Sequence, residues 1–217
     1  MTADLFEGIA DEGPSREVIA EGAVLLRGFA RPFEQQLVTV LRDITAQAPF
    51  RRMITPGGHQ MSVAMTSCGN CGWVTDRAGY RYDATDPQSG KPWPAMPQWL
   101  RQFATEAAEE VGFPGFLPDA CLINRYEVGS RMSLHQDKDE RDLGAPIVSV
   151  SLGLTAIFLF GGMKRSDTPR RFRLLHGDVV VWGGPVRLAY HGIAPLADGE
   201  HPLLGRQRIN LTFRKAR

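Results

Sequence analysis

The chain has 217 residues, is 43% hydrophobic, and carries 25 lysines and arginines against 24 aspartates and glutamates, for a net charge of +1. This length supports one sizeable core, so we expect a single domain over 1–217. The near-neutral balance does not indicate a general polyanion binder, and three cysteines do not imply a disulfide framework. The sequence has no apolar run of about 18 residues and no signal-peptide pattern, so we expect a cytoplasmic protein without a membrane span.

The first predicted elements are an acidic leader, a strand and a helix. Residues 1–22 combine acidic residues with Gly and Pro and predict a loosely ordered leader. The stretch A-V-L-L-R at Ala23–Arg27 predicts a short strand. Five apolar residues then follow at helical spacing and predict a helix near 33–47, which completes an N-terminal segment of 23–48. These five residues are Phe33, Leu37, Val40, Leu41 and Ile44.

Residues 49–96 have almost no regular period and are rich in Gly, Pro, Arg and aromatic residues. They include T-P-G-G-H-Q-M-S-V-A-M-T, a candidate hairpin, and the aromatic stretch G-Y-R-Y. A long irregular stretch inside one domain is typical of a functional lid or of a disordered insert. The tyrosines and tryptophans argue against disorder. A second helix is predicted at about 97–111, inside a supporting segment of 97–118.

After residue 119 the sequence consists of short apolar runs separated by Gly, Pro and Asp turns. Many strands at this spacing predict a sandwich or barrel over 119–217, so the fold class is mainly β with flanking helices. The runs are C-L-I-N-R-Y, I-V-S-V-S-L-G-L, A-I-F-L-F, R-F-R-L-L, D-V-V-V-W, R-L-A-Y-H and R-I-N-L-T-F-R.

The stretch S-L-H-Q-D-K-D-E places His135 and Asp137 at alternate positions. Alternate residues of a strand point the same way, so the two side chains can hold one metal ion. Two histidines and one carboxylate form the facial triad of non-haem Fe(II) oxygenases. The second histidine must come from elsewhere, and the residues alone leave four candidates open: His59, His176, His191 and His201.

The last predicted strand, R-I-N-L-T-F-R, carries a second polar face. Arg208, Asn210, Thr212 and Arg214 share one side by the period-two rule. Buried arginines require anions, and a dicarboxylate would suit two of them. The alternative is an edge strand with a solvated basic face.

Taken together and in order, these motifs resemble the AlkB family of Fe(II)- and 2-oxoglutarate-dependent dioxygenases over nearly the whole chain. The resemblance implies a double-stranded β-helix (jelly-roll) core beneath N-terminal helices and a nucleotide-recognition lid at 49–96. The motifs are H-Q-D-K-D-E, Y-H-G, R-x-N-x-T-F-R, T-P-G-G, M-S-V-A-M-T, K-P-W-P-A-M-P, P-D-A-C-L-I-N-R-Y, A-P-I-V-S-V-S-L-G-L and H-G-D-V-V-V-W-G-G.

The resemblance also implies roles for individual residues. His135, Asp137 and His191 would bind Fe(II), with O2 as a co-substrate. The second co-substrate, 2-oxoglutarate, would be held by Asn124, Tyr126, Arg208, Asn210 and Arg214. His176 would then be a structural turn residue.

The implied reaction hydroxylates an N-methyl group of 1-methyladenine or 3-methylcytosine and releases formaldehyde, while 2-oxoglutarate becomes succinate and CO2. The implied partner is alkylated DNA, single- or double-stranded, with RNA as a further candidate, and the implied protein is a monomer. The substrate would be contacted by Trp73, Tyr80, Tyr82, Asp139, Arg165, Thr55 and Met65, with Ser149 as a further match. Basic residues of the lid and nearby loops, such as Arg131, are candidate phosphate contacts.

Two features depart from the family pattern. Cys68 and Cys71 form a C-x-x-C, which could be a redox pair, half a zinc site or an accident of sequence. Arg131 stands where the family pattern has lysine. Two other readings remain open: a 2-oxoglutarate oxygenase that acts on a protein, lipid or metabolite, and a non-catalytic jelly-roll module.

Overall fold

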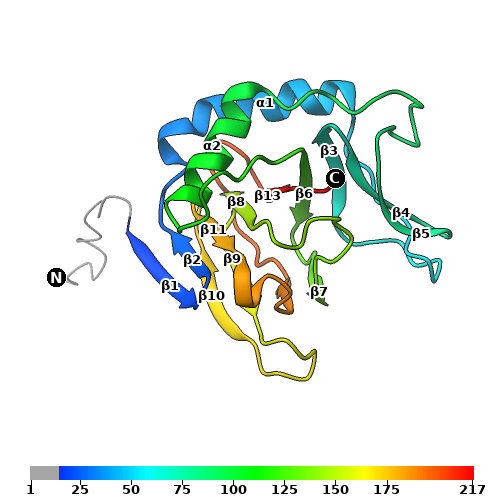
Figure 1. The fold of residues 1–217 in the computed structure, drawn as a ribbon. Helices are drawn as coiled ribbons and strands as arrows, with labels where there is room; N and C mark the ends of the chain where they lie inside the picture. Colours follow the sequence, from blue (N-terminus) through cyan, green and yellow to red (C-terminus); the bar gives the residue numbers. More distant parts are fainter. Residues whose placement is uncertain (1–14) are drawn as a thin grey trace.

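The short strands after residue 119, together with three strands that precede them, form two antiparallel sheets in a computed structural model that describes residues 15–217 (Figure 1). The seven strands of the large sheet are, in spatial order, β1 (Arg16–Ala20), β2 (Ala23–Leu26), β11 (Val179–Trp182), β8 (Ile147–Gly153), β13 (Gln207–Arg214), β6 (Ala120–Glu127) and β3 (Ala64–Gly69). The four strands of the small sheet are β10 (Arg170–Leu174), β9 (Ala156–Phe160), β12 (His191–Ile193) and β7 (Met132–His135). Apart from the consecutive pairs β1–β2 and β9–β10, neighbours in each sheet are distant in sequence, as in the predicted jelly roll.

Two helices cover the outer face of the large sheet: α1 (Glu34–Gln47) and α2 (Gln98–Glu109), at the top of Figure 1. Both helices were predicted from apolar spacing, and both bury that apolar face against the sheet. Short 3-10 turns, η1 (Arg31–Phe33) and η2 (Gly184–Val186), lie before α1 and before β12. None of the helices in the described residues is both long and apolar enough to cross a membrane.

Strand β13 shows why the site lies between the sheets. Ile209, Leu211 and Phe213 belong to the core beneath the helices. The alternate residues, which include Arg208 and Arg214, are also buried but face the small sheet side, where they line a cavity. The predicted polar face is therefore internal, and the alternative of a solvated edge strand is wrong, because β13 is paired on both sides, by β6 and β8.

Two predicted elements differ from the structure. Residues 1–14 lie outside the described residues, but Arg16–Ala20 of the predicted loose leader form β1, because they pair with β2 and bury Ile19 in the core. The predicted strand R-L-A-Y-H begins only at His191. Arg187 instead follows η2, and its guanidinium is buried in polar contacts with the backbone of Ala145 and Asp137.

The predicted lid, 49–96, contains three ordered parts. Strand β3 hydrogen-bonds to β6 at the edge of the large sheet. The hairpin of β4 (Gly72–Asp76) and β5 (Gly79–Asp83) projects beside it, at the right of Figure 1. The T-P-G-G stretch turns tightly, with Ile54 bridged to Gln60.

Candidate active site

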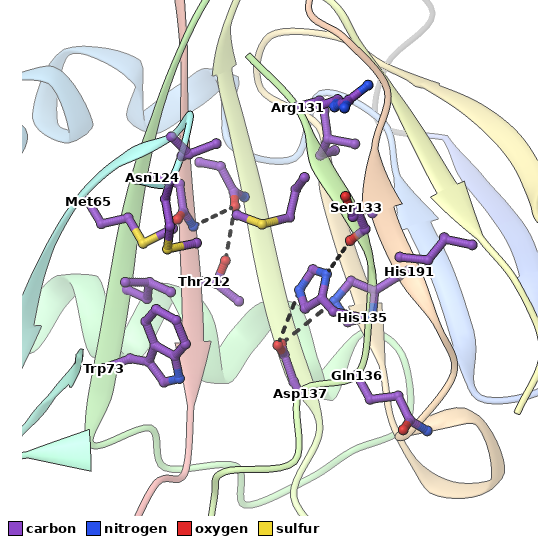
Figure 2. A pocket seen from close by; sticks show the side chains of 18 of the residues that line it. Met65, Trp73, Asn124, Arg131, Ser133, His135, Gln136, Asp137, His191 and Thr212 are labelled. Carbon is purple, nitrogen blue, oxygen red and sulfur yellow. Dashed lines mark hydrogen bonds and ion pairs between the residues drawn. The ribbon is translucent and has the colours of Figure 1, made fainter. Parts of the chain in front are cut away.

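Three side chains that could hold a metal ion meet between the sheets. His135 ends β7 and lies directly opposite His191 on β12, and Asp137 follows two residues beyond the strand (Figure 2). His135 Nε2 lies 3.6 Å from Asp137 Oδ1, and His191 Nε2 lies 3.8 Å from Asp137 Oδ2. Within residues 15–217 this is the one group of three or more potential ligands with donor atoms within 4.8 Å of one another. Cross-strand pairing therefore selects His191 from the four candidates.

Backbone carbonyls orient both imidazoles. Nδ1 of His135 lies 2.9 Å from the carbonyl oxygen of Ser133, and Nδ1 of His191 lies 3.0 Å from that of Ala189. A neutral imidazole that donates from Nδ1 keeps a lone pair on Nε2, so both rings present a ligand atom toward Asp137. His176 is placed differently, in a turn where it pairs with Glu34 and stacks on His201.

The surroundings of Asp137 and His191 set the protonation states of both side chains. Burial would raise the pKa of Asp137, but the guanidinium of Arg214, with smaller contributions from the nearby imidazoles of His191 and His135, outweighs burial and lowers it. Burial, together with the neighbouring His135, lowers the pKa of His191 to about 4. At neutral pH the carboxylate is therefore ionised and the imidazole of His191 is neutral, as metal binding requires.

A polar cradle adjoins this group on strands β6 and β13. Arg208 lies opposite Tyr126, and Asn210 lies opposite Asn124, so four side chains come from two adjacent cross-strand pairs. With Arg214, they line the same cavity as the three potential ligands. The volume of this cavity is about 930 Å³. Strand β8 closes the cradle, because Ser151 accepts from Arg208 at 2.8 Å and Ser149 accepts from Asn210 at 2.8 Å.

Several donors and acceptors of this cradle have no protein partner. Arg208 is 1% exposed, yet its Nε and Nη1 make no hydrogen bond within the described part of the chain, and neither does Asn124 Oδ1. Buried N–H groups without an acceptor are costly, because they lose their hydration and gain no hydrogen bond in exchange. The cradle is therefore suited to an anion that supplies acceptors, such as a carboxylate of 2-oxoglutarate.

Another part of the cavity wall is aromatic and acidic. The ring of Trp73 stacks on Tyr80, with centroids 5.6 Å apart and planes 19° from parallel. Trp73 Nε1 donates to Asp139 Oδ2 at 2.8 Å, so a flat ring and a carboxylate are held side by side. Strand β7 stops at His135, so the strand predicted through Asp137 is too long, and both Asp137 and Asp139 reach the cavity from the loop that follows. Thr55, Met65, Arg165 and Ser149 also line the cavity.

Comparisons with known proteins agree with this geometry. The family model of the 2OG-Fe(II) oxygenase superfamily matches residues 22–214. The chain is 60% identical to the alpha-ketoglutarate-dependent dioxygenase AlkB of Escherichia coli (strain K12), over 98% of this chain and 97% of that protein. It is 31% identical to the DNA N(6)-methyladenine demethylase ALKBH1C of Arabidopsis thaliana, over 95% of this chain and 51% of that protein. The solved structure of OsALKBH1 superposes with a TM-score of 0.79 at 29% identity, over 93% of this chain and 100% of that one.

The chain belongs to the AlkB family of 2OG-Fe(II) oxygenases. It is an iron- and 2-oxoglutarate-dependent dioxygenase, as the resemblance predicted, and a non-catalytic module is excluded. The residues present fit both groups: a two-histidine, one-carboxylate set for Fe(II), and a buried arginine with free donors for 2-oxoglutarate.

One predicted substrate contact of this dioxygenase lies elsewhere. Tyr82 does not line the cavity, and its hydroxyl donates to Glu140 Oε1 at 2.7 Å. Glu140 and its partner Arg187 were not predicted as functional residues. In the sequence Glu140 is one more charge in the run K-D-E-R-D, and only the tertiary structure shows that it is buried.

The C-x-x-C of this dioxygenase forms no metal site in the described residues. Cys68, Cys71 and Cys121 are free and buried. Cys68 lies opposite Cys121 in the pairing of β3 with β6, beneath the helices. Cys71 packs separately, against Ala120, Ala216 and Tyr82. This packing supports the interpretation that the C-x-x-C is an accident of sequence.

Proposed function

We propose that this dioxygenase removes methyl groups from the ring nitrogens of bases such as 1-methyladenine and 3-methylcytosine in DNA, with RNA as a second substrate. The observation that carries the proposal is the side-by-side placement of Trp73 and Asp139 in the cavity that contains His135, Asp137 and His191. An aromatic face suits a flat base, and a carboxylate favours a cationic one. The similar protein ALKBH1C is a DNA N(6)-methyladenine demethylase, which supports a methylated base in DNA as the substrate.

Each group of residues has a proposed task. His135, Asp137 and His191 would hold Fe(II), and Arg208 and Arg214 would pair with the carboxylates of 2-oxoglutarate, assisted by Asn124, Tyr126 and Asn210. When bound, iron and 2-oxoglutarate supply the oxidation that inserts one oxygen atom of O2 into a C–H bond, while the other oxygen atom enters succinate and CO2 leaves. The resulting N-hydroxymethyl group breaks at the C–N bond, so that formaldehyde departs and the ring nitrogen recovers its normal state.

The substrate residues act by placing the base. A base inside a duplex cannot reach the cavity, so it must leave its stack, and Trp73 and Tyr80 offer replacement aromatic faces. Asp139 would accept from the exocyclic amine of the base. Residues 49–96 are proposed as the lid over this base. Arg131, Lys138 and Arg165 line the cavity and are proposed phosphate contacts. The protein is proposed to act as a cytoplasmic monomer.

The proposal is tested by loading the protein without oxygen with Fe(II) and 2-oxoglutarate, then adding air and a single-stranded DNA oligomer with one 1-methyladenine. Mass spectrometry should show loss of one methyl group, with formaldehyde and succinate in equal amounts. Asp137→Ala is the control without the metal ligand, and an RNA oligomer of the same sequence compares the two nucleic acids. Succinate without any change in either oligomer would reject the proposed substrates and retain the oxygenase.

A further inference from the structure

Glu140 is a buried carboxylate with partners from three separate parts of the fold. It is 7% exposed and lies three residues after Asp137. Its Oε1 accepts from the hydroxyl of Tyr82 on β5 at 2.7 Å and lies 3.2 Å from Arg214 Nε on β13. Its Oε2 accepts from Arg187 Nη2 at 3.2 Å, next to η2. Both oxygens are thus used, and none of the three partners is a neighbour in sequence.

Arg187 fixes Glu140 relative to the metal ligand. It is 3% exposed, and its Nη1 donates to the backbone carbonyl of Asp137 at 2.7 Å. Its Nε donates to the carbonyl of Ala145 at 2.9 Å. One guanidinium therefore holds the main chain at both ends of the loop that contains Glu140.

Arg214 lies between two buried carboxylates. Asp137 Oδ2 accepts from its Nη2 at 2.6 Å and from its Nε at 3.0 Å, and Glu140 Oε1 approaches the same Nε. Neither carboxylate accepts a hydrogen bond from Nη1 of Arg214. The guanidinium of Arg214 is thus held by two carboxylates, and Glu140, which lines the same cavity, contacts it at Nε.

A contribution to stability alone does not account for this arrangement. The desolvation of a buried ion pair offsets much of its attraction, so such a pair is weak evidence for stability. The contact of Glu140 with Arg214 instead fixes the orientation of the guanidinium plane. This matters because an arginine binds a carboxylate through two hydrogen bonds only when its plane is correctly oriented.

We propose that Glu140, with Arg187 as its counter-ion, is a positioning residue that fixes the guanidinium of Arg214 for 2-oxoglutarate. The hydroxyl of Tyr82 serves the same purpose, so Tyr82 acts on the co-substrate side of the site and does not contact the base. This inference rests on the proposed assignment of Arg214 to 2-oxoglutarate.

The test is the affinity of 2-oxoglutarate for protein loaded with Mn(II), measured by titration calorimetry without turnover. Glu140→Gln should weaken 2-oxoglutarate binding about tenfold, and Tyr82→Phe about threefold, as expected for the loss of hydrogen bonds to charged groups. Arg214→Lys should weaken it more than either. Asp142→Asn is the matched control, an exposed acid in the same loop, and should leave affinity unchanged.

A second titration separates this role from that of a substrate contact. Tyr82→Phe should bind a methylated oligomer, in the absence of 2-oxoglutarate, within about twofold of the wild type. Weaker oligomer binding with unchanged 2-oxoglutarate affinity would overturn the assignment of Tyr82. If Glu140→Gln binds 2-oxoglutarate as the wild type does while Arg214→Lys does not, the positioning role is wrong and the proposed function stands. If Arg214→Lys also binds 2-oxoglutarate as the wild type does, the assignment of Arg214 to 2-oxoglutarate is wrong as well.

The thermal unfolding of each variant shows whether a weaker affinity reflects partial unfolding. Tyr82→Phe loses one hydroxyl and keeps the ring in its packing against Cys71, so it remains informative if Glu140→Gln does not fold. In the Tyr82→Phe protein, a merely structural role would lower the unfolding temperature and leave the affinity for 2-oxoglutarate unchanged.

Discussion

Arg214 donates two hydrogen bonds to a single oxygen of Asp137, from Nη2 at 2.6 Å and from Nε at 3.0 Å. Strand β13 and the loop after β7 are thereby joined inside the site. The charge of Asp137 keeps the pKa of Arg214 above its usual value despite burial. The contact links a proposed Fe(II) ligand to a proposed 2-oxoglutarate residue. A substitution of either residue should therefore affect the binding of both Fe(II) and 2-oxoglutarate.

Replacing Asp137 by alanine should abolish both iron binding and succinate formation. It should also destabilise the metal-free protein by about 3 kcal/mol, because Arg214 loses its principal buried counter-ion. Metal content after reconstitution, succinate yield and denaturant unfolding check the three outcomes. Retained turnover in this variant would show that iron is bound elsewhere.

Replacing Asp139 by asparagine should reduce the preference for cationic bases. The amide keeps an oxygen that can accept from Trp73 Nε1, so the indole stays in place while the negative charge is removed. We expect kcat/KM for a 1-methyladenine oligomer to fall about tenfold relative to that for a neutral methylated base. Steady-state kinetics on the two oligomers give this ratio. An unchanged ratio would mean that the charge of Asp139 does not act on the base.

The metal-free protein should lose stability as the pH falls from about 6.5 to about 4. His191 is buried with its pKa lowered to about 4, whereas its usual value is 6.5. Between these values the unfolded chain binds a proton that the folded protein does not, so acidification favours unfolding, by up to about 3 kcal/mol from this group. Urea unfolding of chelator-treated protein measures the trend.

The matched variant for this pH dependence is His191→Asn, which does not titrate. Its stability should fall less over the same pH range. An equal fall in both proteins would assign the effect to other groups, such as His176, whose pKa is also lowered by burial and by His201.

The three cysteines should be unreactive in the folded protein. Burial, together with the charge of Asp119, raises the pKa of Cys71 to about 11, and burial also raises the pKa of Cys121. Since the thiolate is the reactive form, iodoacetamide at pH 8 should add to none of them in native protein and to all three after unfolding. Intact mass spectrometry counts the adducts. Rapid native labelling of Cys71, or zinc that Asp137→Ala protein binds at one equivalent and loses when Cys71 is replaced, would restore the redox or zinc reading of the C-x-x-C.

Local patterns in the sequence were sufficient for much of this protein. Apolar spacing located both helices, and period-two alternation identified the buried polar face of β13, because these periods follow from backbone geometry alone. The same rule failed at Arg16–Ala20, because this strand buries only Ile19 and therefore shows no apolar alternation. It also failed at R-L-A-Y-H, where tertiary contacts of Arg187 outweigh strand propensity.

The sequence by itself determined the chemistry that this protein can perform: His135 and Asp137 at strand spacing, two arginines on one face of the last strand, and the order of motifs that marks the AlkB family. Only the tertiary structure decided which residues meet. Pairing of β12 with β7 brings His191 beside His135. Folding also buries Glu140 and Arg187, which in the sequence cannot be told from ordinary surface charges. The reason is physical: side-chain direction repeats locally along a strand, whereas strand partners and burial depend on residues far apart in the chain.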